Sequence, residues 1–401
     1  MIVGIDGNEA NQKIRTGSGV YSLELLRQFK KFQISPASIS TGRANFKFQI
    51  YLKNSPLKDL PSEDSNFEYK IVKPVNFWTQ IGLPFQLWKE KITRKAPDIF
   101  FSLTHYAPRF CPIPSLITIF DLSFIKFPKM FLKKDLYQLR NWTEYSIRQA
   151  KKIITISEFS KNDISNYYKI SPDKIVVAYP GYDKNKFNTQ IKNQKSKIKS
   201  TIQKFKIDRE YILYVGTIQP RKNISRLIDA FRLLNNDYPG LQLVICGMIK
   251  EGRGGWMNDE IIDKIKKSKF GRKDSIIITG YVIDKDLQYL MAGAKTLVLP
   301  SLYEGFGIPV IEAMACGCPV VVSSGISLAE IANGAAILVN PFDVRSIANG
   351  LKEACYNNLR RQDLIKKGLI QIERYDWEKS AEIIFSTIQS VKNDRSKRQN
   401  G

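Results

Sequence analysis

The chain has 401 residues, 43% of them hydrophobic, and a formal net charge of +24. A single core rarely exceeds about 250–300 residues, so we expect two globular domains. No apolar run approaches the roughly 18 residues of a membrane-spanning helix, and "MIVGIDGNEA" lacks the features of a signal peptide. Together with five scattered cysteines, an odd number, this argues against an integral membrane protein or a disulfide scaffold and predicts a reduced, cytoplasmic protein.

The positive charge is concentrated in the front half, where residues 1–190 hold 29 Lys and Arg against 16 Asp and Glu. Such a surplus favours an anionic partner, which could be a phosphate group, a membrane surface or nucleic acid. A general compositional bias toward lysine and isoleucine would explain the same surplus without any partner. The sequence leaves both explanations open.

The first predicted elements alternate between strands and helices. "MIVGID" (1–6) is a strand, "RTGSG" is a loop that contains Gly17 and Gly19, and an amphipathic helix follows from Val20. Further strands rich in isoleucine, valine and phenylalanine are expected at residues 46–52, 98–103, 115–121, 152–157 and 173–183. Buried strands separated by helices are typical of parallel βαβ units.

A lysine-rich segment at residues 188–206 interrupts this pattern, and we interpret it as a linker or a short helix. A second series follows, with strands expected at 211–217, 241–247, 275–282, 296–301, 319–324 and 335–341, and helices from Asp343 onward. The predicted fold class is therefore α/β, with two doubly wound, Rossmann-like domains at residues 1–190 and 206–377. Such domains bind ligands at the carboxyl ends of their strands, and we expect the two to face a deep cleft.

The segment "PSLYEGFGIPVIEAMACGCPVVVSS" (300–324) carries the strongest functional signal. Gly305 and Gly307 lie between a strand and a helix, where backbone amides and the helix dipole favour a phosphate. Glu312 lies about one turn into that helix, where its carboxylate could accept hydrogen bonds from a ribose diol. Glu304 precedes the helix and would reach toward the group that the phosphate carries. The spacing fits a nucleoside diphosphate with a polyhydroxylated substituent.

This segment resembles the E-x7-E motif of the family-four retaining glycosyltransferases, which have the GT-B fold. Similar matches are "YVGTIQPRKNISRLIDAF" (214–231), "TGYVIDKDLQYL", "SSGISLAEI" and "ILVNPFD". The resemblance implies that Arg221 and Lys222 hold the donor diphosphate, because Thr217 occupies the place of an arginine that many members have. It also implies that a C-terminal helix (378–395) crosses back to the first domain. The further donor-binding positions that it implies are Gly17, Gly19, Gly216, Tyr281, Gly305, Phe306, Gly307 and Glu312.

The front half departs from the family at one catalytic position. Members often carry a His-Asp pair at the sugar, whereas "TIFD" places Phe120 before Asp121. The single histidine of the chain, His105, follows the strand at 98–103 and could assist the acceptor in place of the missing one. The expected catalytic residues are Glu304, Arg221, Lys222, Asp121 and His105.

We expect a retaining, metal-independent glycosyltransferase that uses a GDP- or UDP-linked sugar as substrate and needs no cofactor. The "PRKN" variant is similar to mannosyltransferases that use GDP-mannose, so the expected product is a mannosylated glycan or lipid-linked acceptor in polysaccharide or glycolipid biosynthesis. Asp284-Lys285-Asp286 is interpreted as a helix start rather than as a metal site. The expected location is the cytoplasm, including the anionic inner face of the membrane, with no specific nucleic acid bound. A non-catalytic binder of nucleotide sugars or nucleic acid, or a GT-B epimerase, stays open as an alternative.

Overall fold

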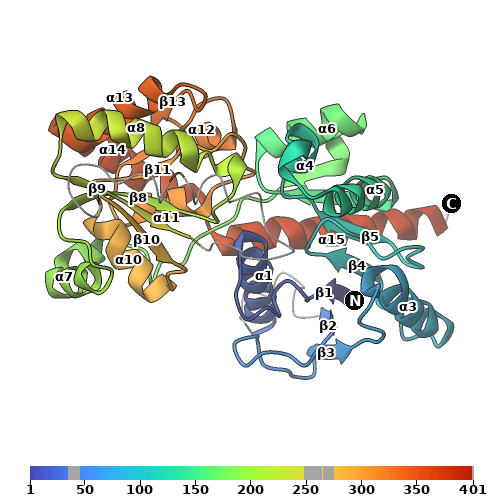
Figure 1. Cartoon of the computed structure of the whole chain (residues 1–401). Coiled ribbons are helices and arrows are strands. Elements are labelled where there is room, and N and C mark those ends of the chain that lie inside the picture. Colours follow the sequence, from blue (N-terminus) through green and yellow to red (C-terminus); the bar gives the residue numbers. More distant parts are fainter. Residues whose placement is uncertain (35–45, 248–263, 265–274, 400–401) are drawn as a thin grey trace. The chain divides into compact units, whose positions relative to one another are not determined.

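The structure is a computed structural model, and it describes residues 1–34, 46–247, 264 and 275–399. The chain forms two compact units. Unit 1 consists of residues 1–122, 134–181 and 376–401, and unit 2 consists of residues 123–133 and 182–375. Each unit is an α/β layer structure around a parallel sheet, as the alternation of strands and helices in the sequence predicts (Figure 1).

Unit 1 contains a seven-stranded sheet in the order β3-β2-β1-β4-β5-β6-β7, and all neighbouring strands are parallel. The strands are short and mostly buried on both faces, which explains their uninterrupted apolar sequences. Their bounds are β1 (Ile2–Asp6), β2 (Lys47–Leu52), β3 (Phe67–Ile71), β4 (Ile99–Ser102), β5 (Ser115–Thr118), β6 (Lys152–Thr155) and β7 (Ile175–Val177).

The helices of unit 1 cover this sheet, and the C-terminal helix is one of them. The Phe385 ring of that helix packs edge-to-face on Phe29 and on Phe46, with centroid distances of 5.5 and 4.9 Å. These aromatic contacts fasten the last helix to the first helix and to the start of β2. The helices are α1 (Gly17–Ile34), the π-helical turn η2 (Trp78–Gly82), α3 (Leu83–Ile92), α5 (Lys133–Gln149), α6 (Glu158–Tyr168) and α15 (Trp377–Gln399).

Unit 2 contains a six-stranded parallel sheet in the order β10-β9-β8-β11-β12-β13. Its strands are β8 (Glu210–Val215), β9 (Leu241–Cys246), β10 (Ile276–Gly280), β11 (Thr296–Leu299), β12 (Val320–Ser323) and β13 (Ile337–Val339). Its helices are α4 (Ser123–Lys126), α7 (Lys195–Lys204), α8 (Ile224–Asp237), α10 (Asp284–Gly293), α11 (Ile308–Ala315), α12 (Ser327–Ala332), α13 (Val344–Tyr356) and α14 (Asn358–Gln371).

Residues 188–206 are not an extended linker in the structure. They form the short turn η5 (Thr189–Asn193) and helix α7, both within unit 2. Ile198 and Ile202 of α7 lie beside Gly293 at the end of α10, and Lys204 forms an ion pair with Asp286 at the start of α10. The apolar side chains at positions 198 and 202 therefore attach a lysine-rich helix to the unit.

The edge strand β3 is absent from the predicted elements. Its sequence, Phe-Glu-Tyr-Lys-Ile, alternates between apolar and charged residues, and burial decreases along the strand from the buried Phe67 to the exposed Ile71. Within the described ranges, no helix combines the length and the apolarity that a membrane crossing requires.

Candidate active site

The loops that follow β8 and β11 are held together at one edge of the unit 2 sheet. These two strands are parallel neighbours, so their carboxyl ends meet there. The backbone N–H of Leu302 donates a hydrogen bond to the carbonyl of Arg221 at 2.8 Å, and the Asn223 side-chain amide donates to the carbonyl of Pro300 at 2.9 Å. Hydrogen bonds therefore join two loops that are about 80 residues apart in the sequence.

Glu304 lies in the centre of this arrangement and is only 6% exposed. Its carboxylate forms ion pairs with Lys222 and with Arg221, the latter with an Nη1–Oε2 distance of 3.2 Å. The Ser301 hydroxyl donates a further hydrogen bond to Oε1 at 2.9 Å. Burial by itself raises the pKa of Glu304, but the two neighbouring cations outweigh burial and lower it to about 2. The carboxylate is therefore ionised at neutral pH and acts as the counterion of both basic side chains.

The backbone of the Glu304 loop is also fixed from the opposite side. The Ser327 hydroxyl donates to the Glu304 carbonyl at 2.6 Å, and Arg221 Nη1 donates to the Tyr303 carbonyl at 3.0 Å. Gly307 connects this loop to α11 with φ of +103°, and a Cβ atom there would lie 2.4 Å from the Leu328 side chain. Only glycine fits at this position. The backbone amides of residues 305–307 therefore lie directly before the first turn of α11.

Phe306 lies in the predicted loop, but its ring faces the interior of unit 2, so a role in donor binding falls to its backbone amide and stays a prediction. Its side chain is 3% exposed and packs edge-to-face on Tyr375 at a centroid distance of 5.5 Å. The ring therefore supports the loop from inside unit 2. Pro309 lies in the first turn of α11, and Gly317 follows its end with φ of +67°, both as predicted from the sequence.

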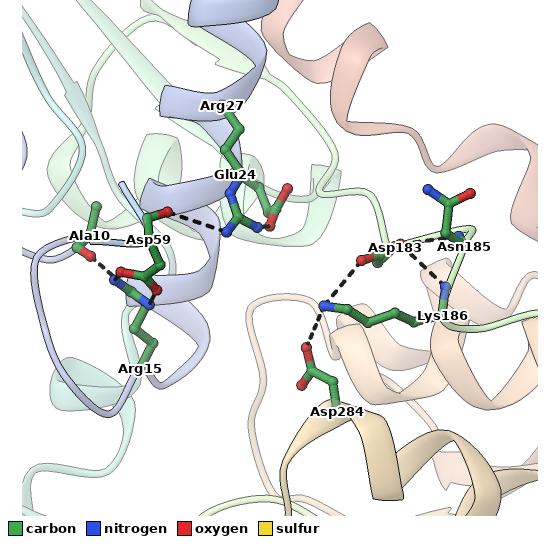
Figure 2. A network of polar contacts seen from close by, with 9 residues as sticks. All are labelled: Ala10, Arg15, Glu24, Arg27, Asp59, Asp183, Asn185, Lys186 and Asp284. Atoms are coloured by element: carbon green, nitrogen blue, oxygen red, sulfur yellow. Dashed lines mark hydrogen bonds and ion pairs between the residues drawn. The ribbon is translucent and has the colours of Figure 1, made fainter. Parts of the chain in front are cut away.

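Glu312 lies in the second turn of α11 and is half-buried. Burial raises the pKa of this carboxyl group to about 8, the negative charges of Asp284 and Asp183 add to the effect, and Lys186 opposes it. Figure 2 shows Lys186 between the two aspartates, with Nζ–Oδ2 distances of 3.1 Å to Asp183 and 3.0 Å to Asp284. Asp183 and Lys186 were not among the predicted site residues; they follow β7, at and beyond the end of the predicted strand at 173–183.

Two other predicted donor positions follow β8 and β10. Gly216 ends β8 with φ of +154°, and its carbonyl oxygen would lie 1.9 Å from a Cβ atom added at Gly247, so these backbones are in close contact. Gly247 also donates a backbone hydrogen bond to Gly280 at 3.0 Å, which places Tyr281 at the same edge of the sheet. The Tyr281 side chain is 51% exposed there.

His105 and Asp121 come together in unit 1, because they follow the neighbouring strands β4 and β5. Burial lowers the pKa of His105, and the negative charge of Asp121 opposes that shift, so the two groups are within electrostatic range. Phe120 lies 5.7 Å from His105 between ring centroids and 5.1 Å from Tyr21 of α1. The structure therefore brings His105 close to Asp121 and to Phe120, and the replacement of the missing family histidine by His105 stays a prediction.

Gly17 and Gly19 lie in the first turn of α1, after the loop that follows β1. A Cβ atom at Gly19 would lie 3.0 Å from the Glu9 carbonyl oxygen, so this glycine permits close packing of the loop. Figure 2 shows that Arg15 holds the same loop by an ion pair with Asp59 and a 2.7 Å hydrogen bond to the Ala10 carbonyl. Nothing lies within 4 Å of a Cβ atom added at Gly17.

Asp284 and Asp286 lie in the first turn of α10, and the residue that caps this helix is Ile283. The interpretation of this D-x-D sequence as a helix start is confirmed, although neither aspartate is the cap. In the described part of the chain, no group of three or more His, Cys, Asp and Glu side chains has the arrangement of a metal site. The described cysteines are free thiols. The glycine-rich segment 252–257 lies outside the described residues.

Comparison with known proteins matches both parts of the chain to glycosyltransferase models. The model Glycosyltransferase Family 4 matches residues 16–186, and the model Glycosyl transferases group 1 matches residues 196–371. O-antigen chain mannosyltransferase B of Escherichia coli is 32% identical over 269 residues, which cover 66% of this chain and 67% of that protein. O-antigen chain mannosyltransferase RfbU of Salmonella typhimurium is 28% identical over 268 residues, 67% of each chain.

A solved structure of Anabaena HepE in complex with UDP-glucose has the same fold. It superimposes with a TM-score of 0.70 at 18% sequence identity and covers 97% of this chain and 99% of that chain. Together with the two parallel α/β sheets, these matches confirm the resemblance drawn from the E-x7-E segment. The chain belongs to the family-four glycosyltransferases of GT-B fold, among relatives that include mannosyltransferases of polysaccharide biosynthesis.

Proposed function

We propose that this glycosyltransferase transfers mannose from a nucleotide diphosphate donor to a glycan or lipid-linked acceptor, with retention of anomeric configuration and without a metal ion. Two mannosyltransferases among its relatives support the choice of sugar. A fold relative in complex with UDP-glucose supports a nucleotide sugar as the donor. The "PRKN" sequence favours GDP over UDP as the nucleotide.

The observation that supports the proposal most is the assembly of Arg221, Lys222 and Glu304 at the joined loops of β8 and β11. Both basic side chains are largely buried, with 15% and 13% of the side-chain surface exposed. In a site of low dielectric constant, such cations stabilise the charge of a departing diphosphate far more than they would in water. Glu304 holds them in place before the donor arrives, and it limits the repulsion between them.

In the proposed reaction, an acceptor hydroxyl attacks the anomeric carbon on the face from which the diphosphate leaves. The new bond joins the acceptor oxygen to this carbon, the bond from the carbon to the phosphate oxygen breaks, and the departing phosphate oxygen takes the acceptor proton. Arg221, Lys222 and the amides of residues 305–307 stabilise the diphosphate, and Glu312 accepts hydrogen bonds from the ribose. His105 and Asp121 of unit 1 serve the sugar or the acceptor.

A thermal-shift comparison of GDP-mannose, GDP, UDP-glucose and UDP tests the donor. A ligand at 100 times its dissociation constant stabilises the folded state by about 2.7 kcal/mol. We expect the largest shift with GDP-mannose, and we expect Lys222→Ala to lose it. Lys204→Ala is a matched control, because it removes an exposed lysine paired with Asp286 in the same unit. If none of the nucleotides shifts the transition, or if both variants respond equally, the donor site is elsewhere.

Retention and metal independence need their own measurements. Proton NMR of the freshly formed product should show the anomeric configuration of the donor, and turnover should be the same in EDTA as in excess Mg²⁺. An inverted product, or turnover that requires a divalent cation, would overturn the corresponding part of the proposal. We further propose that the enzyme works at the inner face of an anionic membrane, where a lipid-linked acceptor would be present.

A further inference from the structure

Large apolar side chains are exposed along one side of α3 and the turn before it. In α3 they recur after three and four residues, the spacing of one helix face, with Phe85 68%, Trp88 45% and Ile92 77% exposed. Three further exposed apolar residues lie outside α3: Phe77 and Ile81 in the segment before it, and Phe110 in the loop after β4. We name as the apolar stripe Phe77, Ile81, Phe85, Trp88, Ile92 and Phe110, all classed as exposed.

The opposite side of α3 is firmly packed, so the exposure of the stripe does not reflect a loose helix. Leu83 and Leu87 are fully buried in a cluster with Tyr51 of β2 and Phe100 of β4. Trp78 belongs to the same cluster and donates a hydrogen bond from its indole nitrogen to the Val72 carbonyl at 3.1 Å. The helix therefore has one face in the core of unit 1 and a second face on which large apolar side chains are exposed.

Backbone conformation and local contacts distinguish three of the aromatic residues in the stripe. Phe77 and Phe110 have φ angles of 54° and 48°, in the left-handed region that bulky residues rarely adopt. The Trp88 indole donates to the Phe110 carbonyl at 3.0 Å, and the Lys91 ammonium lies 5.4 Å from the Trp88 ring centroid. Strained backbone of this kind persists where the surroundings impose it, often at functional surfaces.

Basic residues surround the stripe. Lys89 and Lys91 lie on the two flanks of the α3 face, and both are exposed. Lys73, Arg94, Lys95 and Arg109 add positive charge at its ends, and all except the half-buried Arg109 are exposed. The acidic residue of the segment 73–95 is Glu90, which is 6% exposed and hydrogen-bonded to Tyr51 and Lys70. The solvent-facing side therefore combines aromatic and aliphatic side chains with exposed positive charge.

We propose that the apolar stripe and its basic rim form a docking surface for an anionic phospholipid bilayer. An interfacial helix inserts its apolar face at the boundary of headgroups and acyl chains, while lysine and arginine contact anionic headgroups. Tryptophan with a hydrogen-bonded indole is typical of this boundary. Each basic residue near the surface raises the partition coefficient by about fivefold. The inference builds on the lipid-linked acceptor and membrane location proposed above, and it names the surface that reaches the lipid.

Vesicle sedimentation with the full chain tests the docking surface. The vesicles contain phosphatidylcholine alone or with about 30% phosphatidylglycerol, a fraction chosen to give a clearly negative surface. The apolar variant is Phe85→Ser/Trp88→Ser/Ile92→Ser, and its control is Leu359→Ser/Ile370→Ser, which removes residues of unit 2 that are 81% and 67% exposed. The charge variant is Lys89→Glu/Arg94→Glu/Lys95→Glu, and its control reverses the exposed lysines 195, 197 and 199 of α7.

We expect the wild type and both controls to sediment with anionic vesicles at low salt, and not with neutral vesicles. The apolar and charge variants should each lose at least tenfold in partitioning, with unchanged thermal transitions because every altered side chain is exposed. Equal loss in variants and controls, or no binding by the wild type, would overturn the proposal. If the wild type sediments even without vesicles and the apolar variant does not, the stripe is instead a contact surface between two copies of the chain, and the proposal is overturned. Nucleotide-induced thermal shifts should persist in every variant, so a failure of lipid docking is distinct from a failure of the proposed reaction.

Discussion

The two units of the chain share an architecture but differ in how their polar and apolar groups are distributed. Unit 2 concentrates buried charge where its central strands end, with Arg221, Lys222 and Glu304 in one group. Unit 1 places a histidine and an aspartate at the ends of β4 and β5, next to the aromatic rings of Phe120 and Tyr21. It also exposes the apolar stripe on α3.

In the proposed reaction, this difference corresponds to the two halves of a sugar transfer. A diphosphate is recognised by fixed positive charge and backbone amides, so its site is built from a few buried ionic side chains. A sugar or lipid-linked acceptor offers hydroxyl groups and apolar surface, so its site needs fewer charges and more aromatic contact. The following predictions test this division, beginning with the largest expected effect.

Lys222→Ala should have the largest effect on activity. Loss of one preorganised group that stabilises the leaving charge lowers the rate by about 10²–10³-fold, or roughly 3–4 kcal/mol in the barrier. The measurement is kcat for sugar transfer or donor hydrolysis at saturating donor. Lys204→Ala, on the surface of the same unit, should keep normal turnover. A Lys222→Ala enzyme with wild-type kcat would remove the cation from the mechanism.

Glu304→Gln should mainly lower the free energy of unfolding. It leaves Arg221 and Lys222 largely buried without their common counterion, and breaking such a pair costs about 3 kcal/mol. A nucleoside diphosphate would supply the missing negative charge, so GDP should stabilise this variant more than it stabilises the wild type. Urea denaturation with and without GDP measures both effects. Equal stabilisation of variant and wild type would mean that the diphosphate does not reach these cations.

His105→Ala should lower kcat at saturating acceptor by about tenfold, the effect of losing one hydrogen bond of roughly 1–1.5 kcal/mol that positions the sugar or the acceptor. Burial lowers the pKa of this histidine, which favours the neutral imidazole, and one of its ring nitrogens can accept a hydrogen bond. His105→Gln keeps a polar side chain that can also form a hydrogen bond, and it should be less impaired than His105→Ala. An unchanged rate in both variants would mean that His105 takes no part in the reaction.

The pH dependence of donor binding should report Glu312. Its pKa of about 8 in the free protein lies above the ordinary value of 4.5, so the carboxyl group is mostly protonated at pH 7. If the ionised form binds the ribose, affinity should rise with pH up to about 8, by at most about tenfold per pH unit. Calorimetry between pH 6 and 9 measures this rise, and Glu312→Gln should abolish it. A wild-type affinity that falls over this range would contradict the assignment.

The raised pKa of Glu312 also affects the stability of the free protein, which should decrease as the pH rises. A carboxyl group with a raised folded-state pKa binds its proton more tightly in the folded state. The free energy of unfolding should therefore fall as pH rises from about 4.5 to 8, relative to Glu312→Gln. Asp183, Lys186 and Asp284 act electrostatically on this group, and Lys186→Ala should extend the fall to higher pH, because Lys186 is the positive charge that lowers the pKa of Glu312.

Much of the fold was predictable, because buried parallel strands have uninterrupted runs of apolar residues that can be recognised in the sequence. "YILYV" and "LQLVIC" became the neighbouring strands β8 and β9, as their apolar runs indicated. The segment with Glu304 and Glu312 also had the expected strand, turn and helix. The edge strand β3 was missed because two of its five residues are charged. For residues 188–206 the sequence did not decide between a linker and a short helix, because the lysines of α7 hide the apolar pair Ile198 and Ile202; the structure confirms the helix.

The side-chain partners of the site were less predictable, because they depend on strand order. No spacing in the sequence places His105 beside Asp121; the pairing of β4 with β5 does so. The same holds for Lys186, which reaches Asp284 from almost 100 residues away. The resemblance implied Phe306 as a donor-binding position without saying which of its atoms would bind; the structure places the ring inside the unit against Tyr375, which leaves its backbone amide for that role.

The most direct test of the central claim is a crystal structure with GDP bound. We predict that the diphosphate lies within hydrogen-bonding distance of Arg221, Lys222 and the amides of residues 305–307, with the ribose hydroxyls on Glu312. A nucleotide bound away from the loops of β8 and β11, or one whose phosphates contact neither basic side chain, would contradict the account.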